Sequence, residues 1–196
     1  MRRAFFARDT LTVTRDLLGR HLVRLLDGTR VSARIVEAEA YIGEEDEASH
    51  ASPGPTARNA TMYGPAGYGY VYLIYGMYHC FNIVTECEGF PAAVLIRAAE
   101  PLEGLDSMRK RRGPVGVRDT TKLTSGPGRL CQALAIDLRH DGVDLCAPGA
   151  PLFLELGDPV SDGLVGTSPR VNVRGDEAAL DAAWRFYVTG SPHLSG

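Results

Sequence analysis

The sequence predicts a single domain of the α/β (α+β) class, with a mostly antiparallel, curved sheet flanked by helices and a protruding β-hairpin. Two observations support this prediction. The 196 residues are 44% hydrophobic and 23% charged, which is ordinary for one folded domain. Strand-like and helical patterns are mixed along residues 1–196, and neither a repeat nor a linker divides them into two units.

The bounds of the predicted elements follow from capping residues and from Gly and Pro. A first helix begins after a cap at Asp9 or Thr10 and ends at Gly19. Pro127 begins another helix, because proline fits the first helical turn. The β-branched and aromatic run on both sides of Gly76 predicts a hairpin. We expect strands at 20–26, 30–41, 68–75, 79–85, 91–97 and 185–188, further helices at 102–112, 127–136 and 176–184, and a long loop at 42–67.

Composition excludes several classes of protein. The cysteines form no C-x-x-C pair, so we expect free thiols in a reducing compartment, not a disulfide scaffold or a zinc ribbon. No stretch approaches the roughly 18 apolar residues that a membrane span needs, so we expect an intracellular protein without a membrane partner. The net charge of −3 and the pI of about 6.0 argue at first against a nucleic-acid partner.

The charge is unevenly distributed along the chain. Residues 1–30 and 101–130 each carry a net charge of +4, whereas 31–60 carry −4. The densest basic run is Arg109, Lys110, Arg111 and Arg112. Such a run is either a solvated helix face or a surface that contacts phosphates.

Two carboxylates stand out in the strand predicted at 30–41. Alternation places Glu37 and Glu39 on the face that begins with Val31, Ala33 and Ile35 and ends at Tyr41. Acidic side chains on an inward face are costly unless they are paired or functional. We therefore expect either a general base tuned by partial burial, or glutamates that turn to solvent or meet arginines.

The following loop and hairpin add candidate residues. His50 follows a run of acids, but a metal site drawing on Glu37, Glu39, Asp46 and His50 matches no metal-binding spacing, and we expect no metal. Six of the eight tyrosines lie between residues 63 and 78. Tyr68 and Tyr70 are predicted to pack in the sheet, whereas Tyr75, at the hairpin tip, is predicted to be a wedge or a stacking platform for a nucleobase.

These residues carry a family resemblance that runs in order along almost the whole chain. The sequence resembles the alkyladenine (3-methyladenine) DNA glycosylase family. The matching segments are 36–41, 46–50, 56–59, 62–64, 70–78 with Asn82, 94–101, 125–127, 130–134, 186–188 and 190–192. The basic run at 109–112 is not among the recognisable motifs of that family.

The resemblance implies a monofunctional enzyme of base-excision repair. Such an enzyme flips an alkylated or deaminated purine out of duplex DNA and hydrolyses its N-glycosidic bond without a cofactor. Glu39 matches the general base that activates the attacking water, and Arg97 the arginine that helps to hold this water near the phosphate of the flipped nucleotide. Tyr41 matches the residue on one face of the flipped base, with His50 and Tyr72 on the other.

The remaining matches concern discrimination and the DNA surface. Asn82 matches the residue that crowds the amino group of normal guanine, and the backbone carbonyl near Val171 is a further acceptor for the water. Tyr75 matches the side chain inserted into the duplex, with Met77 and Tyr78 beside it in the minor groove. The expected partner is damaged double-stranded DNA, bound by a monomer inside the cell, in the cytoplasm or nucleoid if the protein is bacterial.

Three other functions are compatible with the same residues. A metal-dependent nuclease or phosphodiesterase would use the acidic loop, and a non-catalytic nucleic-acid-binding module would use the tyrosines alone. A sugar hydrolase would use Glu37 and Glu39 as paired acids, although their adjacent positions on one face leave little room for a substrate.

Overall fold

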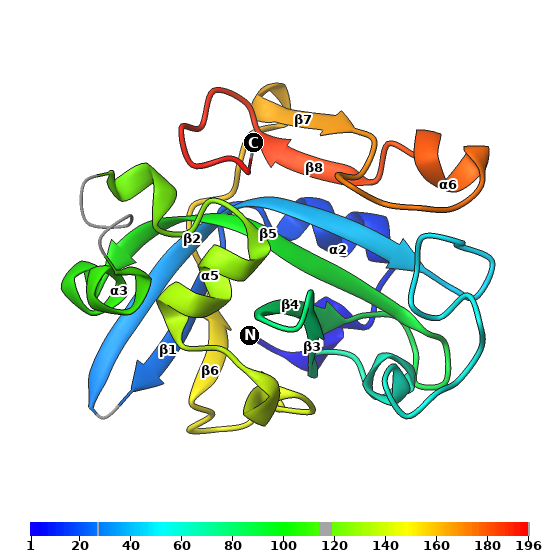
Figure 1. Cartoon of the computed structure of the whole chain (residues 1–196), viewed down its shortest axis with the longest axis horizontal. Helices are drawn as coiled ribbons and strands as arrows, with labels where there is room; N and C mark the ends of the chain where they lie inside the picture. The colour runs from blue at the N-terminus through cyan, green and yellow to red at the C-terminus, as the bar shows by residue number, and fades with distance from the viewer. Residues whose placement is uncertain (27, 114–118, 196) are drawn as a thin grey trace.

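Two long strands, β2 (Thr29–Ile42) and β5 (Ala92–Glu103), form the centre of the sheet in the computed structural model (Figure 1). The structure describes residues 1–26, 28–113 and 119–195. Within these residues the sheet has eight strands in the order β3-β4-β5-β2-β1-β6, and β8 pairs with both β2 and β7. The other strands are β1 (His21–Leu26), β3 (Gly69–Ile74), β4 (Tyr78–Val84), β6 (Leu152–Glu155), β7 (Val165–Ser168) and β8 (Arg185–Val188).

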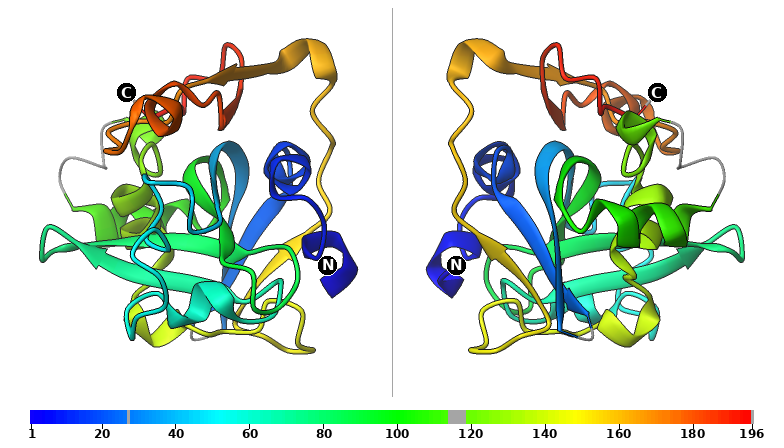
Figure 2. Two further views of the ribbon diagram at one scale, coloured as in Figure 1. Left: turned by 90° about the vertical axis from the view of Figure 1, so that its right-hand side faces the viewer. Right: turned by 90° about the vertical axis from the view of Figure 1, so that its left-hand side faces the viewer.

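The described strands pair antiparallel throughout, as the sequence predicts. Because β2 is long, it has different neighbours at its two ends. β1 pairs with its first half and β8 with its second half. The β3–β4 hairpin extends beyond the rest of the sheet, which confirms the predicted protrusion (Figure 2).

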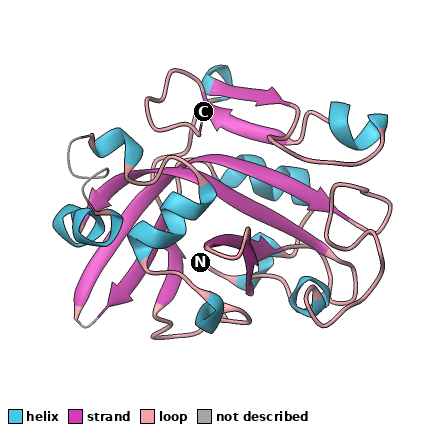
Figure 3. Ribbon diagram, viewed as in Figure 1, coloured by secondary structure: helices cyan, strands magenta, loops and turns pink. Residues whose placement is uncertain are grey.

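Short helices lie around this sheet (Figure 3). The Asp9 side chain accepts a hydrogen bond from the Thr12 N–H and caps α2, as predicted. Helix α2 packs on β2 and β5, whereas α5 packs on β4 and β5. The described helices are α1 (Arg3–Phe6), α2 (Thr10–Leu17), α3 (Leu105–Arg112), α5 (Pro127–Leu134) and α6 (Glu177–Asp181), with 3-10 turns at Ala60–Tyr63, Thr120–Lys122, Leu138–His140 and Asp162–Leu164.

Several predicted bounds are wrong. The strand predicted at 91–97 continues to Glu103, so the helix predicted at 102–112 begins only at Leu105. Gly104 makes this sharp change of direction with a φ of 74°, and a Cβ there would meet the Arg30 carbonyl oxygen at 3.0 Å. The helices predicted at 127–136 and 176–184 are shorter, and the loop predicted at 42–67 contains a 3-10 turn.

The structure also bears on the predictions about disulfides and membrane spans. All four cysteines are unpaired, as expected. No helix in the described part of the chain has the length and apolar character needed to cross a membrane.

A pair of β-bulges separates the charged residues of β2 and β5 from the core. Ile35 pairs with Ala99 but Glu37 pairs with Ala98, so Val36 is an extra residue on β2. Arg97 is the extra residue on β5, because Ala38 next pairs with Ile96. Since each extra residue shifts the alternation by one, Glu37 and Glu39 lie on the face opposite Ile35.

The predicted single face from Val31 to Tyr41 is therefore wrong. Val31, Ala33 and Ile35 belong to the main core, and the next member of that core on β2 is Ala38. The glutamates instead share a face with Tyr41, and they do so without leaving the protein interior. The bulges thus give β2 a core face and a polar face that change sides at Val36.

The basic run lies on α3, where it holds that helix against its neighbours. The Arg111 Nε donates to the Ala133 carbonyl of α5 at 2.7 Å. The Arg112 Nε donates to the Leu123 carbonyl at 3.1 Å, and its Nη1 contacts the Gln132 amide oxygen. Arg109 pairs with Asp106 on the same helix. Two of the four cations, both half-buried, therefore donate to backbone carbonyls of neighbouring segments.

We predict that Arg111→Met lowers the free energy of unfolding by about 1–2 kcal/mol, because a charge-assisted hydrogen bond to the last turn of α5 is lost. Lys110→Met, which removes an exposed cation from the same helix, is the matched control and leaves stability unchanged. Urea denaturation followed by circular dichroism measures both. Equal stability of the two variants would contradict a structural role for Arg111.

Candidate active site

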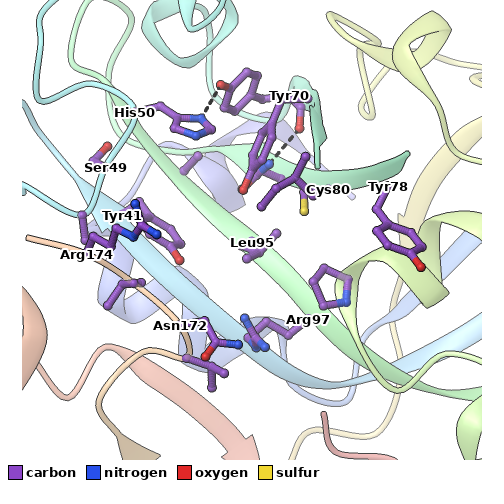
Figure 4. A pocket seen from close by; sticks show the side chains of 18 of the residues that line it. Tyr41, Ser49, His50, Tyr70, Tyr78, Cys80, Leu95, Arg97, Asn172 and Arg174 are labelled. Carbon is purple, nitrogen blue, oxygen red and sulfur yellow. Dashed lines mark hydrogen bonds between the residues drawn. The ribbon is translucent and has the colours of Figure 1, made fainter. Parts of the chain in front are cut away.

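A cavity of about 530 Å³ opens on the face of the sheet that carries Tyr41 (Figure 4). Alternate residues of four neighbouring strands point into it, as the pleat requires. The loop around His50, the segment 171–174 and the start of α5 complete its walls. The strand residues are Tyr41 from β2, Ala93, Leu95 and Arg97 from β5, Tyr78, Cys80 and Asn82 from β4, and Tyr70, Tyr72 and Ile74 from β3.

Glu39 lies beneath this cavity and is held by three groups that line it. Its Oε1 accepts the Val171 N–H at 2.7 Å, and its Oε2 accepts Arg97 Nη1 at 3.1 Å and the Tyr41 hydroxyl at 3.0 Å. Burial, and to a smaller extent the Glu39 carboxylate, raise the pKa of Tyr41 well above its ordinary value. The Tyr41 hydroxyl therefore stays protonated and is the donor in this hydrogen bond. The burial of Glu39 is complete, where the sequence predicts partial burial.

Arg97 connects both glutamates. Its Nε donates to Glu37 Oε1 at 3.0 Å, while Nη1 contacts Glu39. Burial alone would lower the pKa of Arg97, but the carboxylates of Glu39 and Glu37 raise it instead, so the guanidinium stays charged. Both glutamates therefore meet an arginine, which is one of the alternatives that the sequence left open, and the role of general base stays a prediction.

The aromatic side chains predicted to hold a base meet in the same cavity. The rings of His50 and Tyr72 are in edge contact, with centroids 4.3 Å apart. His50 Nδ1 is hydrogen-bonded to the hydroxyl of Tyr70, which is buried as predicted. Burial, and to a smaller extent the positive charge of Arg58, lower the pKa of His50, so its ring is neutral at pH 7. Figure 4 places His50 and Tyr41 on different walls of the cavity.

Asn82 lines the cavity from β4. Its side-chain N–H donates to the Tyr70 carbonyl at 3.0 Å, which fixes the orientation of the amide. The structure thus brings together Glu39, Arg97, Tyr41, His50, Tyr72, Asn82 and Val171, the predicted catalytic and base-binding residues.

The hairpin tip stands at the rim of this cavity. Tyr75 is 79% exposed, and both it and Tyr78 are among the lining residues. Tyr75 and Gly76 have φ angles of 53° and 69°, a turn that matches the twist of a two-stranded hairpin. A left-handed conformation is strained for a tyrosine. The basic run at 109–112 does not line the cavity.

The chain is similar to proteins of a known family over almost its whole length. A model of the methylpurine-DNA glycosylase family matches residues 4–192. A protein of Alkaliphilus oremlandii (strain OhILAs) is 47% identical over 201 residues, covering 100% of this chain and 98% of the relative. One of Methanocella arvoryzae is 52% identical over 195 residues, covering 98% and 94%. Both carry the name "Putative 3-methyladenine DNA glycosylase".

The chain belongs to the methylpurine-DNA glycosylase family. This confirms the resemblance seen in the sequence and, with it, the expectation of a hydrolase that acts on N-glycosyl bonds.

Sequence reasoning missed the ion pair of Arg170 and Asp46, which lies beside this glycosylase site. The two side chains are fully buried and form two hydrogen bonds of 2.6 and 2.8 Å. The Arg170 guanidinium also stacks on the rings of Tyr41 and Trp184. The pair thereby joins the acidic loop to the segment of Val171, behind the ring of Tyr41.

The acids considered as metal ligands have other partners in this glycosylase. Asp46 accepts hydrogen bonds from Arg170, and Glu37 and Glu39 both contact Arg97. Among the residues that the structure describes, no group of three or more His, Cys, Asp or Glu side chains is arranged to hold a metal ion. Asp46 lies within the acidic run from Glu44 to Glu47, so nothing local singles it out, and its partner Arg170 is 124 positions away.

We predict that Asp46→Asn lowers the free energy of unfolding by about 3–5 kcal/mol, because it leaves the Arg170 cation buried without a counter-ion. Asp106→Asn is the control, since Asp106 pairs with Arg109 on an exposed helix face and its loss leaves stability unchanged. Chemical denaturation of both variants tests this. A wild-type midpoint for Asp46→Asn would show that the buried pair is not essential to the loop.

Proposed function

We propose that this protein removes alkylated purines, with 3-methyladenine as the type substrate, from double-stranded DNA. It acts as a monomer on intracellular DNA and leaves an abasic site. The observation that supports this most directly is the position of Glu39 beneath an aromatic cavity, in contact with Arg97, Tyr41 and Val171. The cavity volume of about 530 Å³ lies within the range of small-ligand pockets and accommodates one flipped base.

The aromatic walls suit a cationic base. An N-alkylated purine carries a positive charge that is attracted to the faces of Tyr41 and Tyr72, whereas a normal purine is neutral. His50 is itself neutral at pH 7 and does not repel that charge. Asn82 is held in one orientation by Tyr70, so it presents a fixed edge against the amino group of normal guanine. Deaminated purines lack this positive charge, so their binding would depend on shape complementarity with the cavity alone.

The hydrolysis needs only a base and a positioned water. Glu39 takes a proton from the water, the water oxygen bonds to C1′, and the electron pair of the C1′–N bond leaves with the purine. This pair cancels the positive charge of an alkylated purine, which makes it a good leaving group. Arg97 holds the water and the adjacent phosphate, and the Val171 carbonyl accepts a further hydrogen bond from the water.

The exposed hairpin supports base flipping. Tyr75 occupies the space that the flipped base vacates in the duplex, and Met77 and Tyr78 lie in the minor groove beside it. An exposed aromatic side chain held in a strained turn is costly unless it is used, which favours this role. Lys110 is the exposed member of the basic run, so phosphate contact by the run would be made mainly by Lys110.

We predict that Glu39→Gln lowers the rate of 3-methyladenine release from alkylated duplex DNA by about 10²–10⁴-fold while DNA affinity is retained. Glu47→Gln is the matched control, because Glu47 lines the same cavity but is exposed. Single-turnover release and a DNA-binding titration measure the two quantities. Normal release by Glu39→Gln would refute its assignment as the base.

We predict opposite effects of Tyr75→Asn on stability and function. Asparagine tolerates the left-handed turn, so the free energy of unfolding rises by about 1 kcal/mol. Capture of the flipped base weakens, which reduces the fluorescence change of a base analogue at the target position. Tyr63→Phe, which alters a tyrosine outside the hairpin, changes neither the turn nor the fluorescence signal. An unchanged signal with Tyr75→Asn would count against the wedge role.

A further inference from the structure

Glu37 is a buried carboxylate for which the proposed reaction has no direct use. It has no exposed surface and does not line the cavity. Four donors nevertheless converge on it. They are Arg97 Nε at 3.0 Å, Arg185 Nε at 2.7 Å, and the N–H and hydroxyl of Ser195 at 2.6 and 2.7 Å.

The same contacts immobilise Arg97. Its Nε and Nη2 donate to the Ser195 hydroxyl oxygen at 3.2 and 3.1 Å, while Nη1 donates to Glu39. All three nitrogens of the guanidinium therefore have a protein partner, and its plane is fixed by residues from β2 and from the segment after β8. Each Nη carries a second N–H, which can donate to the water or the phosphate. Without Glu37 and Ser195, Arg97 would keep only Glu39 among these protein partners.

The charges in this group balance. Glu37 and Glu39 carry two negative charges, and Arg97 and Arg185 carry two positive charges. Burial alone would raise the pKa of Glu37, but the hydrogen bonds from Ser195 and Arg185 and the charge of Arg97 outweigh it, and the pKa is lowered. Glu37 therefore remains ionised at neutral pH. The groups that face it are Arg97 of β5, Arg185 of β8 and Ser195.

We propose that Glu37 is a positioning residue for the glycosylase reaction: with Ser195 it fixes Arg97 and shares its charge, so that Glu39 remains basic enough to activate water. This inference rests on the proposed function. A carboxylate that faces a cation alone is a weaker base than one that shares the cation with a second carboxylate. Loss of the Glu37 charge therefore leaves Glu39 as the one carboxylate that faces Arg97 and weakens the base.

The test is Glu37→Gln, which keeps the shape of the side chain and removes its charge. Single-turnover release of 3-methyladenine from alkylated duplex DNA is measured across pH, beside DNA affinity. We expect release to slow by about 10–100-fold, the acidic limb of the pH profile to move to lower pH, and the affinity to stay within about two-fold of wild type. Glu103→Gln, which alters a carboxylate paired with Arg30 away from the cavity, is the control and changes none of these.

Two results would overturn the inference. One is a release rate for Glu37→Gln within about two-fold of wild type. The other is slower release with the acidic limb in place, which indicates structural damage alone. Failure of the proposed function is distinguishable, because the wild-type protein itself would then release no base.

A second variant decides the question if Glu37→Gln does not fold. Ser195→Ala removes the hydroxyl that contacts Glu37 and Arg97 but keeps every charge. We expect slower release, by about 3–10-fold, with the acidic limb unmoved and DNA affinity retained. Wild-type release by Ser195→Ala would then overturn the positioning role.

Discussion

The Arg97 guanidinium, buried between two carboxylates, is the interaction on which the rest of the site depends. A buried cation is costly unless its charge and its N–H groups are satisfied. Arg97 meets both conditions through Glu37, Glu39 and Ser195, which come from β2 and from the segment that follows β8. These two parts of the chain and β5, which carries Arg97, must therefore be in place before the site exists, and the geometry of the candidate site is inseparable from the tertiary fold.

The bulges at Val36 and Arg97 make this interaction possible. A regular pairing of β2 with β5 would leave Glu37 and Glu39 on the face of Ile35, inside an apolar core. One extra residue on each strand turns the charged groups to the other face without disturbing the pairing on either side. The cavity lies on that face, so its floor carries the charged groups and its walls carry Tyr41, His50 and Tyr72. A neutral aromatic wall above a balanced ionic floor suits a substrate whose charge lies in the plane of a stacked base.

The sequence was sufficient for six of the eight described strands, for the hairpin tip and for the residues that share the cavity, because these depend on local patterns and on the family resemblance. It set no bounds for β6 or β7. It was not sufficient for the bulges. Val36 and Arg97 are ordinary strand residues, and only the partner strand reveals that each is unpaired. The Arg170–Asp46 pair and the Ser195 contact with Glu37 were also missed, since each joins residues more than 100 positions apart. The contacts of Arg111 and Arg112 with backbone carbonyls likewise require the position of α5.

The same long-range pairing explains why the net charge of −3 was a poor guide to partners. The acidic segment 31–60 carries −4, but Glu37, Glu39 and Asp46 are buried against Arg97, Arg185 and Arg170, which come from later segments. Buried and neutralised charges contribute little field at the surface, where a DNA phosphate would be. Repulsion between this segment and DNA then comes from exposed acids such as Glu44, Glu45 and Glu47. A charge count by segment assumes that neighbours in sequence are neighbours in space, and in a sheet of long antiparallel pairings they are not.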